Sequence, residues 1–389
     1  MGIKSEVIII GADHHNTLAA VRDIGKNYSG QATVLIHSNR NEKLMISSSK
    51  YVRGRLYSVT EKADSIFSWL IDNHMSFMNG TVLFPCSDLA AFAIDRHALE
   101  LSKYYRIAGF SEMPGYVSTL MDKWEQKQFA DKYDIPMAKT WRLDLNDDIN
   151  NSEITFPCIL KPEISAFGRK SDIIVCDDTE AFQEALILLK NKQYSIVLCQ
   201  EFLNKKYESC CYGCIVNDKF VGTTVRKIRE TPKGSTCYAV FDSKGTESIV
   251  DRIIKVLTDL KYSGPIDLEL LVCNDKAYLC EINFRQSGNA YALNCNGVPT
   301  ATLWCNSTTS KEIESINAQS MHFNGKTHMD DKGDLLYLSY NKISIANYLM
   351  CFIRASGHAI WDLKDLSGTF AFYKPLFMRA VNKILKKRK

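Results

Sequence analysis

Carboxylate and amide side chains recur at every second position in two consecutive segments, Ile266–Leu271 and Ala277–Arg285. The alternation of polar and apolar residues is typical of half-buried β-strands. The short turn Cys273–Lys276 between the segments predicts an antiparallel pair. On such a pair, the two-residue period places one set of polar side chains on a single face. The members of this set are Asp267, Glu269, Glu281, Asn283 and Arg285.

Oxygen donors gathered on one face are the ligands that Mg²⁺ prefers in proteins. Burying two or three carboxylates without a cation would cost several kcal/mol for each ion. The set is therefore a candidate magnesium cage. A solvated hairpin face with alternating charges has the same pattern, so the hairpin taken alone leaves both interpretations open.

Three segments upstream have residues that a nucleotide site needs. Lys161 ends an apolar strand, and the small-residue loop 165–171 after it would let backbone N–H groups approach phosphate oxygens. The strand Val197–Leu203 runs into a linker whose backbone could hydrogen-bond an adenine edge while Leu203 packs on the ring. Glu208 could accept hydrogen bonds from ribose hydroxyls. A lysine at the end of a strand is usually a surface residue, and a loop with one glycine is weak evidence for phosphate binding. The interpretation as a nucleotide site therefore depends on the order of the three segments along the chain.

Short apolar strands alternate with helical patterns over the first hundred residues, which predicts a parallel sheet covered by helices. Ligands of such sheets lie at the carboxyl ends of the strands, here near Asp13 and Asp88. The dinucleotide fingerprint G-x-G-x-x-G is missing after Ile10, so we expect no NAD site. Asp-His-His also occurs in metal-dependent phosphoesterases, but we expect Asp13 or Asn16 to cap the following helix instead. The expected elements are strands Val7–Ile10, Thr33–Ile36 and Thr81–Phe84 and helices Thr17–Ile24, Ala63–Met75 and Asp88–Tyr104.

A break at Glu112–Gly115 separates this region from a second one. Helices are expected there at Lys123–Tyr133, Thr179–Lys190 and Thr246–Leu260. The expected strands are Lys139–Leu143, Ile159–Lys161, Ile173–Cys176, Ile196–Gln200, Cys210–Val216, Phe220–Thr224, Ile266–Val272 and Ala277–Ile282.

Taken together, these residues resemble the ATP-grasp superfamily over roughly residues 1–310. The positions that look like its ATP-binding residues are Lys123, Lys161, Gln200, Glu201, Leu203 and Glu208. A narrower resemblance, to carboxylate–amine ligases of the D-aspartate ligase and cell-surface polymer type, rests on the segments 16–22, 84–88 and 361–365.

The resemblance also assigns roles to the polar residues of the predicted hairpin. Glu269, Glu281 and Asn283 match the magnesium ligands, with the two acidic residues twelve positions apart. Asp267 competes with Glu269 for one metal position, and the spacing favours Glu269. Arg285 matches the arginine that in many members holds the reacting acyl-phosphate or carboxylate, so Arg285 and Lys161 would be the catalytic residues.

The resemblance implies an α/β protein with a parallel, Rossmann-like domain before the ATP-grasp domain. The first would span residues 1–113 and the ATP-grasp domain residues 114–310, with antiparallel sheets in a smaller part (114–200) and a larger part (201–310). Residues 311–389 would be a C-terminal extension, packed on the main body or peripheral to a membrane.

The implied activity is an ATP-dependent ligase that converts a carboxylate into an acyl-phosphate and joins it to an amine. Its cofactors would be ATP and Mg²⁺, with two ions that Mn²⁺ can replace. The substrates would be small molecules, an amino acid and an amino or uronic sugar, in the synthesis of cell wall or surface polysaccharide. Arg285, Arg226 and Arg229 are candidate ligands of an anionic substrate, although the last two also suit a solvated basic face.

Two other functions remain open. An ATP-grasp carboxylase acting through carboxyphosphate would use the same nucleotide residues. A non-catalytic nucleotide-binding assembly protein would also keep the fold, although it would have no reason to keep the matched lysines, carboxylates and Arg285. A homodimer is compatible with each of these functions.

The composition excludes some other classes. A net charge of +4 gives no support for a nucleic-acid partner. The 13 cysteines, with no secretory signal pattern, favour reduced thiols in a cytoplasmic protein. The cluster Cys210-Cys211-x-x-Cys214 is interpreted as buried small residues rather than a zinc site. The segments Tyr348–Ile353 and Phe370–Leu385 are apolar and aromatic with basic ends, and they either pack on the body or dock on the anionic inner face of a membrane.

Overall fold

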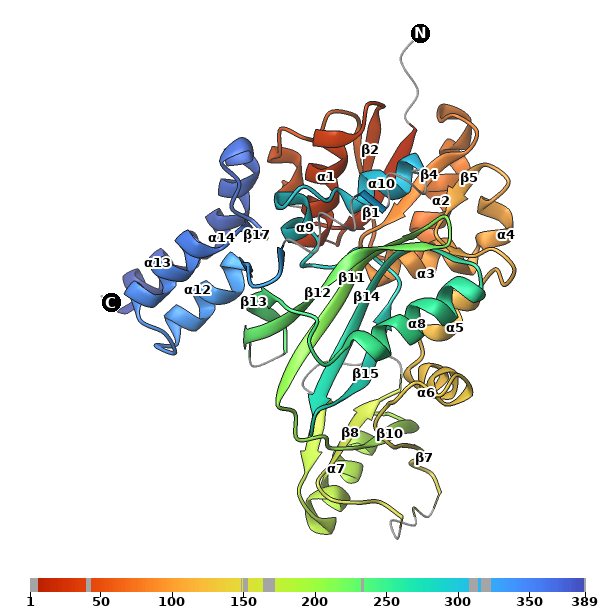
Figure 1. Ribbon diagram of the computed structural model, residues 1–389, viewed down its shortest axis with the longest axis vertical. Helices are drawn as coiled ribbons and strands as arrows, with labels where there is room; N and C mark the ends of the chain where they lie inside the picture. Colours follow the sequence, from red (N-terminus) through yellow and green to blue (C-terminus); the bar gives the residue numbers. More distant parts are fainter. Residues whose placement is uncertain are drawn as a thin grey trace.

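A parallel sheet forms the N-terminal region of the computed structural model, which describes residues 6–39, 43–147, 149, 153–163, 172–231, 234–307, 314–315 and 323–387 (Figure 1). Its strand order is β3-β2-β1-β4-β5. The apolar run of β1 is buried on both faces of the sheet, which is typical of a strand between two layers of helices. The strands are β1 (Val7–Ala12), β2 (Ala32–His37), β3 (Leu56–Val59), β4 (Thr81–Pro85) and β5 (Tyr105–Ile107).

Helices cover both faces of this sheet. Alternate residues of β1 face two different cores: Val7 and Ile9 pack with α1, and Ile8 and Ile10 pack with α2 and α3. Gly11 allows β1 to approach the start of α1, because a Cβ there would lie 2.3 Å from Oγ1 of Thr17. The helices are α1 (His15–Asn27), α2 (Ala63–Asn73), α3 (Asp88–Arg96) and α4 (Ala98–Leu101).

The expected helix Asp88–Tyr104 is wrong in one respect. His97 leaves the helical conformation (φ −112°, ψ 24°) and divides the segment into α3 and α4. The ring of His97 stacks on Phe67 of α2, with 3.8 Å between the centroids. This aromatic contact accompanies the break, and a pattern of apolar residues does not reveal it.

A small antiparallel sheet of order β7-β10-β8-β9 follows after α5 (Tyr116–Leu120) and α6 (Lys123–Lys132). Apolar residues of α7 (Thr179–Asn191) bury its inner face. In Figure 1 this sheet lies at the lower end of the molecule, beyond the tip of the large sheet. Its strands are β7 (Thr140–Asp144), β8 (Cys158–Pro162), β9 (Ile174–Cys176) and β10 (Ile196–Glu201).

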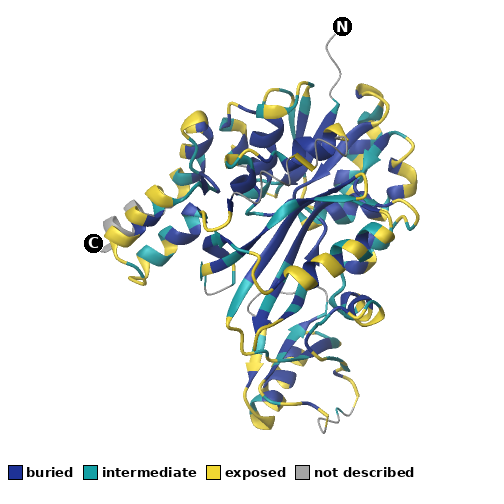
Figure 2. Ribbon diagram, in the orientation of Figure 1, coloured by how far each residue is buried: buried dark blue, intermediate teal, exposed yellow. Residues whose placement is uncertain are grey.

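The large sheet has the order β15-β14-β11-β12-β13-β16-β17, and β6 (Gly109–Phe110) pairs with β14. Residues of α8 (Glu247–Asp259) cover one face and pack with Leu268 and Leu270. Figure 2 shows the buried residues concentrated in these central strands. The strands are β11 (Tyr207–Val216), β12 (Lys219–Glu230), β13 (Thr236–Phe241), β14 (Tyr262–Cys273), β15 (Lys276–Asn283), β16 (Thr327–Met329) and β17 (Gly357–His358).

The C-terminal residues are joined to both preceding regions. Strand β16 extends the large sheet, whereas Asp365 forms a fully buried ion pair with Arg22 of α1, with 2.8 Å between carboxylate oxygen and Nε. The side chain of Phe372 is also buried. The helices after β15 are α9 (Tyr291–Cys295), α10 (Thr300–Asn306), α12 (Asp331–Ser339), α13 (Ile345–Arg354) and α14 (Leu366–Lys387), and the short turn η5 is Leu363–Asp365.

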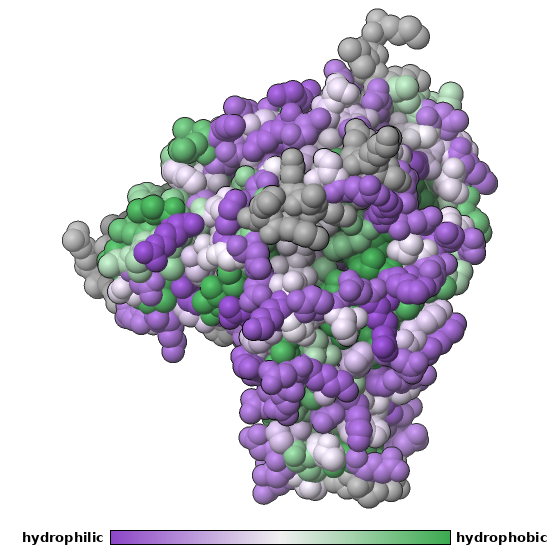
Figure 3. Space-filling model, in the orientation of Figure 1, coloured by the Kyte–Doolittle hydropathy of each residue, from purple (hydrophilic) through white to green (hydrophobic). Residues whose placement is uncertain are grey.

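The surface of this C-terminal part differs from the rest. In Figure 3 hydrophobic side chains gather over the lobe formed by α13 and α14, while most of the visible face is hydrophilic. Within the described ranges, no helix has the length and apolar character needed to cross a membrane.

Three cysteines of β11, Cys210, Cys211 and Cys214, are buried in the sheet with free thiols. Cys210 and Cys214 belong to one core and Cys211 to the other, so their side chains diverge. Among the described residues, no three His, Cys, Asp or Glu side chains are grouped closely enough to hold a metal ion by themselves.

Candidate functional site

The hairpin β14–β15 brings the expected carboxylates together. Its antiparallel register pairs Asp267 with Asn283 and Glu269 with Glu281. Leu268, Leu270 and Ile282 pack in the core beneath α8, so alternation directs the four polar side chains to the opposite face of the sheet. The structure therefore has the antiparallel strand pair that the sequence predicts, with the polar side chains on one face.

A β-bulge makes this arrangement possible. Glu269 pairs with Glu281, and the next residue, Leu270, pairs with Leu279. Cys280 therefore has no partner in the register and is the extra residue of the bulge. Ala277 and Leu279 face the α8 core, and strict alternation from them would bury Glu281 there as well. The extra residue moves Glu281 to the polar face.

The grouped carboxylates are electrostatically strained without a cation. Burial raises the pKa of Glu269 to about 7, and the charges of Glu281 and Asp267 add to this effect. Within the described structure, Oδ1 of Asp267 is buried without a hydrogen-bond partner. Two carboxylates and the Asn283 amide fit one side of a Mg²⁺ site, because Mg²⁺ is usually bound by one or two carboxylates together with substrate phosphates.

Two lysines lie beside this face. Nζ of Lys161 donates to Oε1 of Gln200 at 2.8 Å, and the Gln200 amide donates to Thr140 at 2.9 Å. Burial and the positive charge of Lys123 together lower the pKa of Lys161 to about 8, although the charge of Glu281 opposes the shift. Lys161 of the small sheet therefore interacts with Glu281 of the hairpin, and Lys123 at the start of α6 lies close enough to act on Lys161. The expected phosphate loop 165–171 lies outside the described residues.

Two further expected nucleotide residues lie where the small sheet ends: Glu201 is the last residue of β10, and Leu203 lies in the linker to β11. The backbone N–H groups of Glu201 and Phe202 donate to Lys139 and Pro157, and half-buried Leu203 follows the end of β10. A base edge would therefore have to use backbone groups other than these two N–H donors.

Glu208 is part of an ion-pair network. Its carboxylate accepts from Nζ of Lys227 at 2.6 Å and also from Lys205. Burial favours the neutral acid, but the Lys227 charge and the hydrogen bonds outweigh it and hold the pKa of Glu208 below its ordinary value. Buried Lys227 also interacts with Glu269, so it is the basic residue of β12 that faces the carboxylates.

Arg285 connects the hairpin to the N-terminal sheet. Its Nη1 lies 2.7 Å from Oδ2 of Asp267 and its Nε lies 3.2 Å from Oδ1 of Asp88, the first residue of α3. The N–H of Gln286 donates to the carbonyl of Pro85 at 3.0 Å. The carboxyl ends of the parallel strands, where we expected ligands, therefore meet the carboxylate face at Arg285.

The first residues of α1 add side chains that the sequence did not assign to this site. Asn16 donates to the carbonyl of Gln286 at 3.4 Å. Burial lowers the pKa of His15 to about 4, and the charges of Lys332 and Arg285 add to this effect. His15 is therefore neutral near pH 7, and Lys332 of α12 supplies a positive charge near Arg285 from a segment beyond the expected ATP-grasp region.

The expected helix cap is wrong. Neither Asp13 nor Asn16 caps α1, whose N-cap His14 makes no side-chain hydrogen bond to the helix. The Asp13 carboxylate instead accepts from the N–H groups of Met45 at 2.8 Å and Ile46 at 3.0 Å, at the start of the short turn η1 (Ile46–Ser48).

Arg226 and Arg229 are not brought into the group around Arg285. Arg226 pairs with Asp242 at 3.0 Å and is the cross-strand partner of Ser209, on the face away from Glu208. Arg229 binds the buried carboxylate of Asp334 and lies over the ring of Tyr238. Both side chains are therefore held by internal ion pairs.

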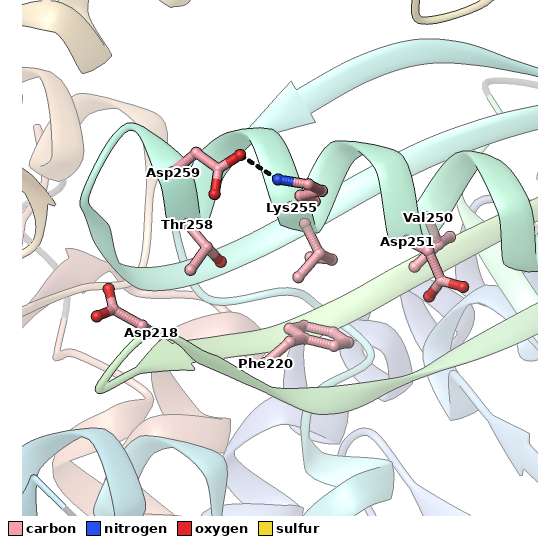
Figure 4. Close-up of a pocket in the computed structure, with 8 residues that line it drawn as sticks. Asp218, Phe220, Val250, Asp251, Lys255, Thr258 and Asp259 are labelled. Carbon is pink, nitrogen blue, oxygen red and sulfur yellow. Dashed lines mark hydrogen bonds and ion pairs between the residues drawn. The ribbon is translucent and has the colours of Figure 1, made fainter.

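A cavity of about 420 Å³ between α8 and the β11–β12 hairpin also has carboxylates (Figure 4). Asp218 and Asp259 lie at one end and Asp251 at the other, and Asp259 pairs with Lys255. These side chains do not converge, and α8 covers the face opposite the hairpin carboxylates. We assign no chemistry to this cavity.

No family model matches the chain. Its fold is similar to that of the L-amino acid ligase from Bacillus licheniformis, with a TM-score of 0.61, 13% identity and coverage of 80% of this chain and 78% of that chain. N5-carboxyaminoimidazole synthetase from Staphylococcus aureus complexed with ADP gives a TM-score of 0.60, 14% identity and 79% coverage of both chains. Biotin carboxylase from Campylobacter jejuni gives 0.59, 16% identity, and coverage of 80% of this chain and 73% of that chain. At these identities the similarity establishes a shared fold.

Proposed function

We propose, from the ATP-grasp fold that this chain has, that it is an ATP-dependent ligase. It would activate a substrate carboxylate as an acyl-phosphate and join it to an amine. The observation that carries this proposal is the crowding of Asp267, Glu269 and Glu281 on one sheet face, with Arg285 closing one side. Such a group is unfavourable in the isolated protein and is stabilised by a cation with bound phosphates.

Nucleotide binding is assigned to residues of both antiparallel sheets. Lys123 and Lys161 would neutralise phosphate charge, and Gln200 would keep Lys161 in place through their hydrogen bond. Glu201 and Leu203 would contact the base, and Glu208 would accept from the ribose hydroxyls. Glu269, Glu281 and Asn283 would hold Mg²⁺, in one or two ions that Mn²⁺ can replace, with Asp267 as the alternative ligand. When bound, the metal supplies charge neutralisation at the transferred phosphate.

The reaction would proceed in two steps. A substrate carboxylate oxygen attacks the γ-phosphorus, the bond to the β–γ bridging oxygen breaks, and ADP forms. The amine nitrogen then attacks the acyl carbon, loses a proton, and phosphate leaves as the amide forms. Arg285 is placed to bind the carboxylate first and to stabilise the tetrahedral oxyanion afterwards. Positioning would supply most of the rate enhancement.

The substrate pair follows from weaker observations. The similarity to an L-amino acid ligase supports an amino acid as one substrate. An amino or uronic sugar is proposed as the other, in the synthesis of cell wall or surface polysaccharide at the cytoplasmic face of a membrane. The positive charges of Lys332 and Arg285 both act on His15, which favours an anionic group beside that residue. Arg226 and Arg229 are not retained as substrate ligands, because Arg226 lies on the face of the sheet away from the carboxylates and Asp334 holds Arg229 outside the group around Arg285.

Carboxylation through carboxyphosphate is the second candidate. The similarity to N5-carboxyaminoimidazole synthetase and biotin carboxylase favours it. A non-catalytic nucleotide-binding role is the third, and it predicts binding without ADP release.

Trapping with hydroxylamine distinguishes the three functions. The protein is incubated with Mg-ATP, hydroxylamine and a panel of amino acids and uronic acids. ATP-dependent hydroxamate that requires the acid supports amide ligation. ADP release that requires bicarbonate and gives no hydroxamate contradicts it in favour of carboxylation. ATP binding without either product supports the non-catalytic role.

A further inference from the structure

The outer face of α13 carries large apolar side chains in contact with solvent. Ile345, Leu349 and Ile353 recur every four residues and are 66%, 51% and 79% exposed. Residues four apart share one face of a helix. The opposite side of α13 is already buried, because Tyr348 and Cys351 pack with Tyr238 and Met329. The fold therefore uses one apolar side of the helix and leaves a second one uncovered.

α14 and the turn before it continue this surface. Phe370 and Phe377 are 58% and 68% exposed, and Leu363 is 72% exposed. The ring of Trp361 contacts Phe352 of α13 and Phe370 of α14, so it joins the two helices into one lobe. We call the exposed apolar side chains of this lobe the apolar surface: Ile345, Leu349, Met350, Ile353, Leu363, Leu366, Phe370, Phe377 and Met378.

The charges of this part of the chain are segregated. Residues 335–389 contain ten Lys and Arg and two Asp, which gives them a net charge of +8. Because the whole chain has a net charge of +4, the residues before 335 have a net charge of −4. Both acidic residues face the body: Asp362 pairs with Lys26 at 2.9 Å and Asp365 pairs with Arg22. The exposed charges beside the apolar surface are therefore cationic, among them Lys342, Arg354, Lys364 and Lys374.

A groove runs along the edge of this surface. It has a volume of about 1300 Å³ and lies between residues 43–48 and α14. Phe370, Phe377 and Met378 line it together with Lys43, Lys374 and Asp13, whose carboxylate is held by the N–H groups of Met45 and Ile46. Apolar rings and ammonium groups in one groove fit the boundary between acyl chains and anionic headgroups.

We propose that α13 and α14 dock the protein on an anionic lipid bilayer, with the apolar surface inserted at the headgroup level and the surrounding lysines and arginines on the headgroups. A bilayer accounts for protruding apolar side chains on two helices and for the one-sided charge. This inference does not depend on the reaction proposed above. It would hold the N-terminal sheet and α12, which carries Lys332, close to the membrane surface.

Vesicle co-sedimentation of the full chain tests the proposal. The lipids are phosphatidylcholine alone and equal parts of phosphatidylcholine and phosphatidylglycerol. We expect the wild type to bind only the mixed vesicles, and less tightly as salt is raised. Lys364→Gln with Lys374→Gln should weaken binding about fivefold for each lysine. Leu349→Ser with Ile353→Ser should weaken it at least about tenfold.

Matched substitutions elsewhere control for charge and polarity. Lys103→Gln with Lys132→Gln makes the same charge change on exposed lysines, and Met75→Ser with Leu99→Ser removes exposed apolar side chains. Both should bind as the wild type does. Unchanged thermal unfolding midpoints would show that all variants fold.

Three results would overturn the proposal. The first is wild-type protein that stays in the supernatant with the mixed vesicles. The second is an equal loss of vesicle binding in the lobe variants and the control variants. The third is a concentration-dependent dimer that Leu349→Ser with Ile353→Ser abolishes while vesicle binding is unaffected. The last result would assign the surface to a second copy of the chain.

Discussion

Lys161 shows how single residues of the site are tuned. Its ammonium group is buried near the positive charge of Lys123, which together lower its pKa to about 8. Below about pH 8 the group is charged and attracts phosphate oxygens, and above it the charge is lost. Because the pKa is lowered, the attraction disappears as pH rises through this value rather than near the ordinary lysine pKa.

We therefore predict that kcat/KM for ATP falls as pH rises through about 8. Lys161→Arg keeps its charge throughout this range and should shift the fall to higher pH, whatever its overall rate. ADP release measured over a pH series checks this. A fall at the same pH in both proteins would contradict the assignment.

Glu269 gives a second prediction, for stability. Its pKa of about 7 in the folded protein lies above the ordinary value of 4.5. As pH rises between these values, the unfolded chain releases its proton first, so the folded state loses stability relative to it. Without metal, Glu269→Gln should be more stable than the wild type at pH 8 by about 3 kcal/mol and show no such gain at pH 4.5.

Urea unfolding in a chelating buffer at the two pH values measures this difference. Glu184→Gln, an exposed residue of α7, is the control and should show no pH-dependent gain. A loss of stability in Glu269→Gln at pH 8 would mean that the glutamate is a structural partner rather than a strained ligand.

At the scale of elements, the strands of the site followed from the sequence better than their irregularities. Alternation in 266–271 and 277–285 was enough to predict which polar residues share a face, because the period of a strand is two. In the sequence, the bulge at Cys280 is visible only because the apolar residues change from odd positions, Ala277 and Leu279, to even positions, Ile282 and Phe284. Short strands such as β16 and β17 have no such pattern, and tertiary pairing decides them.

The turn η5 and α1 give a prediction about how elements are held together. Asp365 accepts from Arg22, from Ser49 at 2.7 Å and from the Lys50 N–H at 3.0 Å, and both charges are fully buried. Asp365→Asn would leave the Arg22 charge without its partner, at a cost of about 3–5 kcal/mol in the free energy of unfolding. Denaturant unfolding checks this, with exposed Asp72→Asn as control. A change below about 1 kcal/mol would show that the pair does not fasten the C-terminal part to the body.

At the scale of the molecule, the sequence indicated the parallel sheet and the antiparallel sheets that follow it along the chain, but not where these sheets meet. Arg285 was identified by its place after β15, whereas its partner Asp88 and its neighbours His15 and Lys332 come from α3, α1 and α12. Long-range docking of this kind leaves no periodic signal. The same limit explains Arg226 and Arg229, whose neighbours in the chain suggested a substrate face while their partners Asp242 and Asp334 lie elsewhere.

The division of the site between two sheets predicts that ligand binding stabilises the whole molecule. Mg²⁺ with a non-hydrolysable ATP analogue should raise the thermal midpoint, equivalent to about 2.7 kcal/mol at a hundred times its Kd. A chelator should remove most of the gain, because the metal neutralises the hairpin carboxylates. Differential scanning fluorimetry measures it. An equal gain with and without Mg²⁺ would contradict the magnesium assignment.

The central claim is that the carboxylate face of β14–β15 works on Mg-ATP. The most direct measurement is acid-dependent ADP release by Glu281→Gln beside the wild type and Glu184→Gln. The account predicts a loss of at least about a hundredfold in Glu281→Gln, with wild-type rates in the control and a thermal midpoint in metal-free buffer that is no lower than that of the wild type. Turnover of Mg-ATP by Glu281→Gln at the wild-type rate would contradict it.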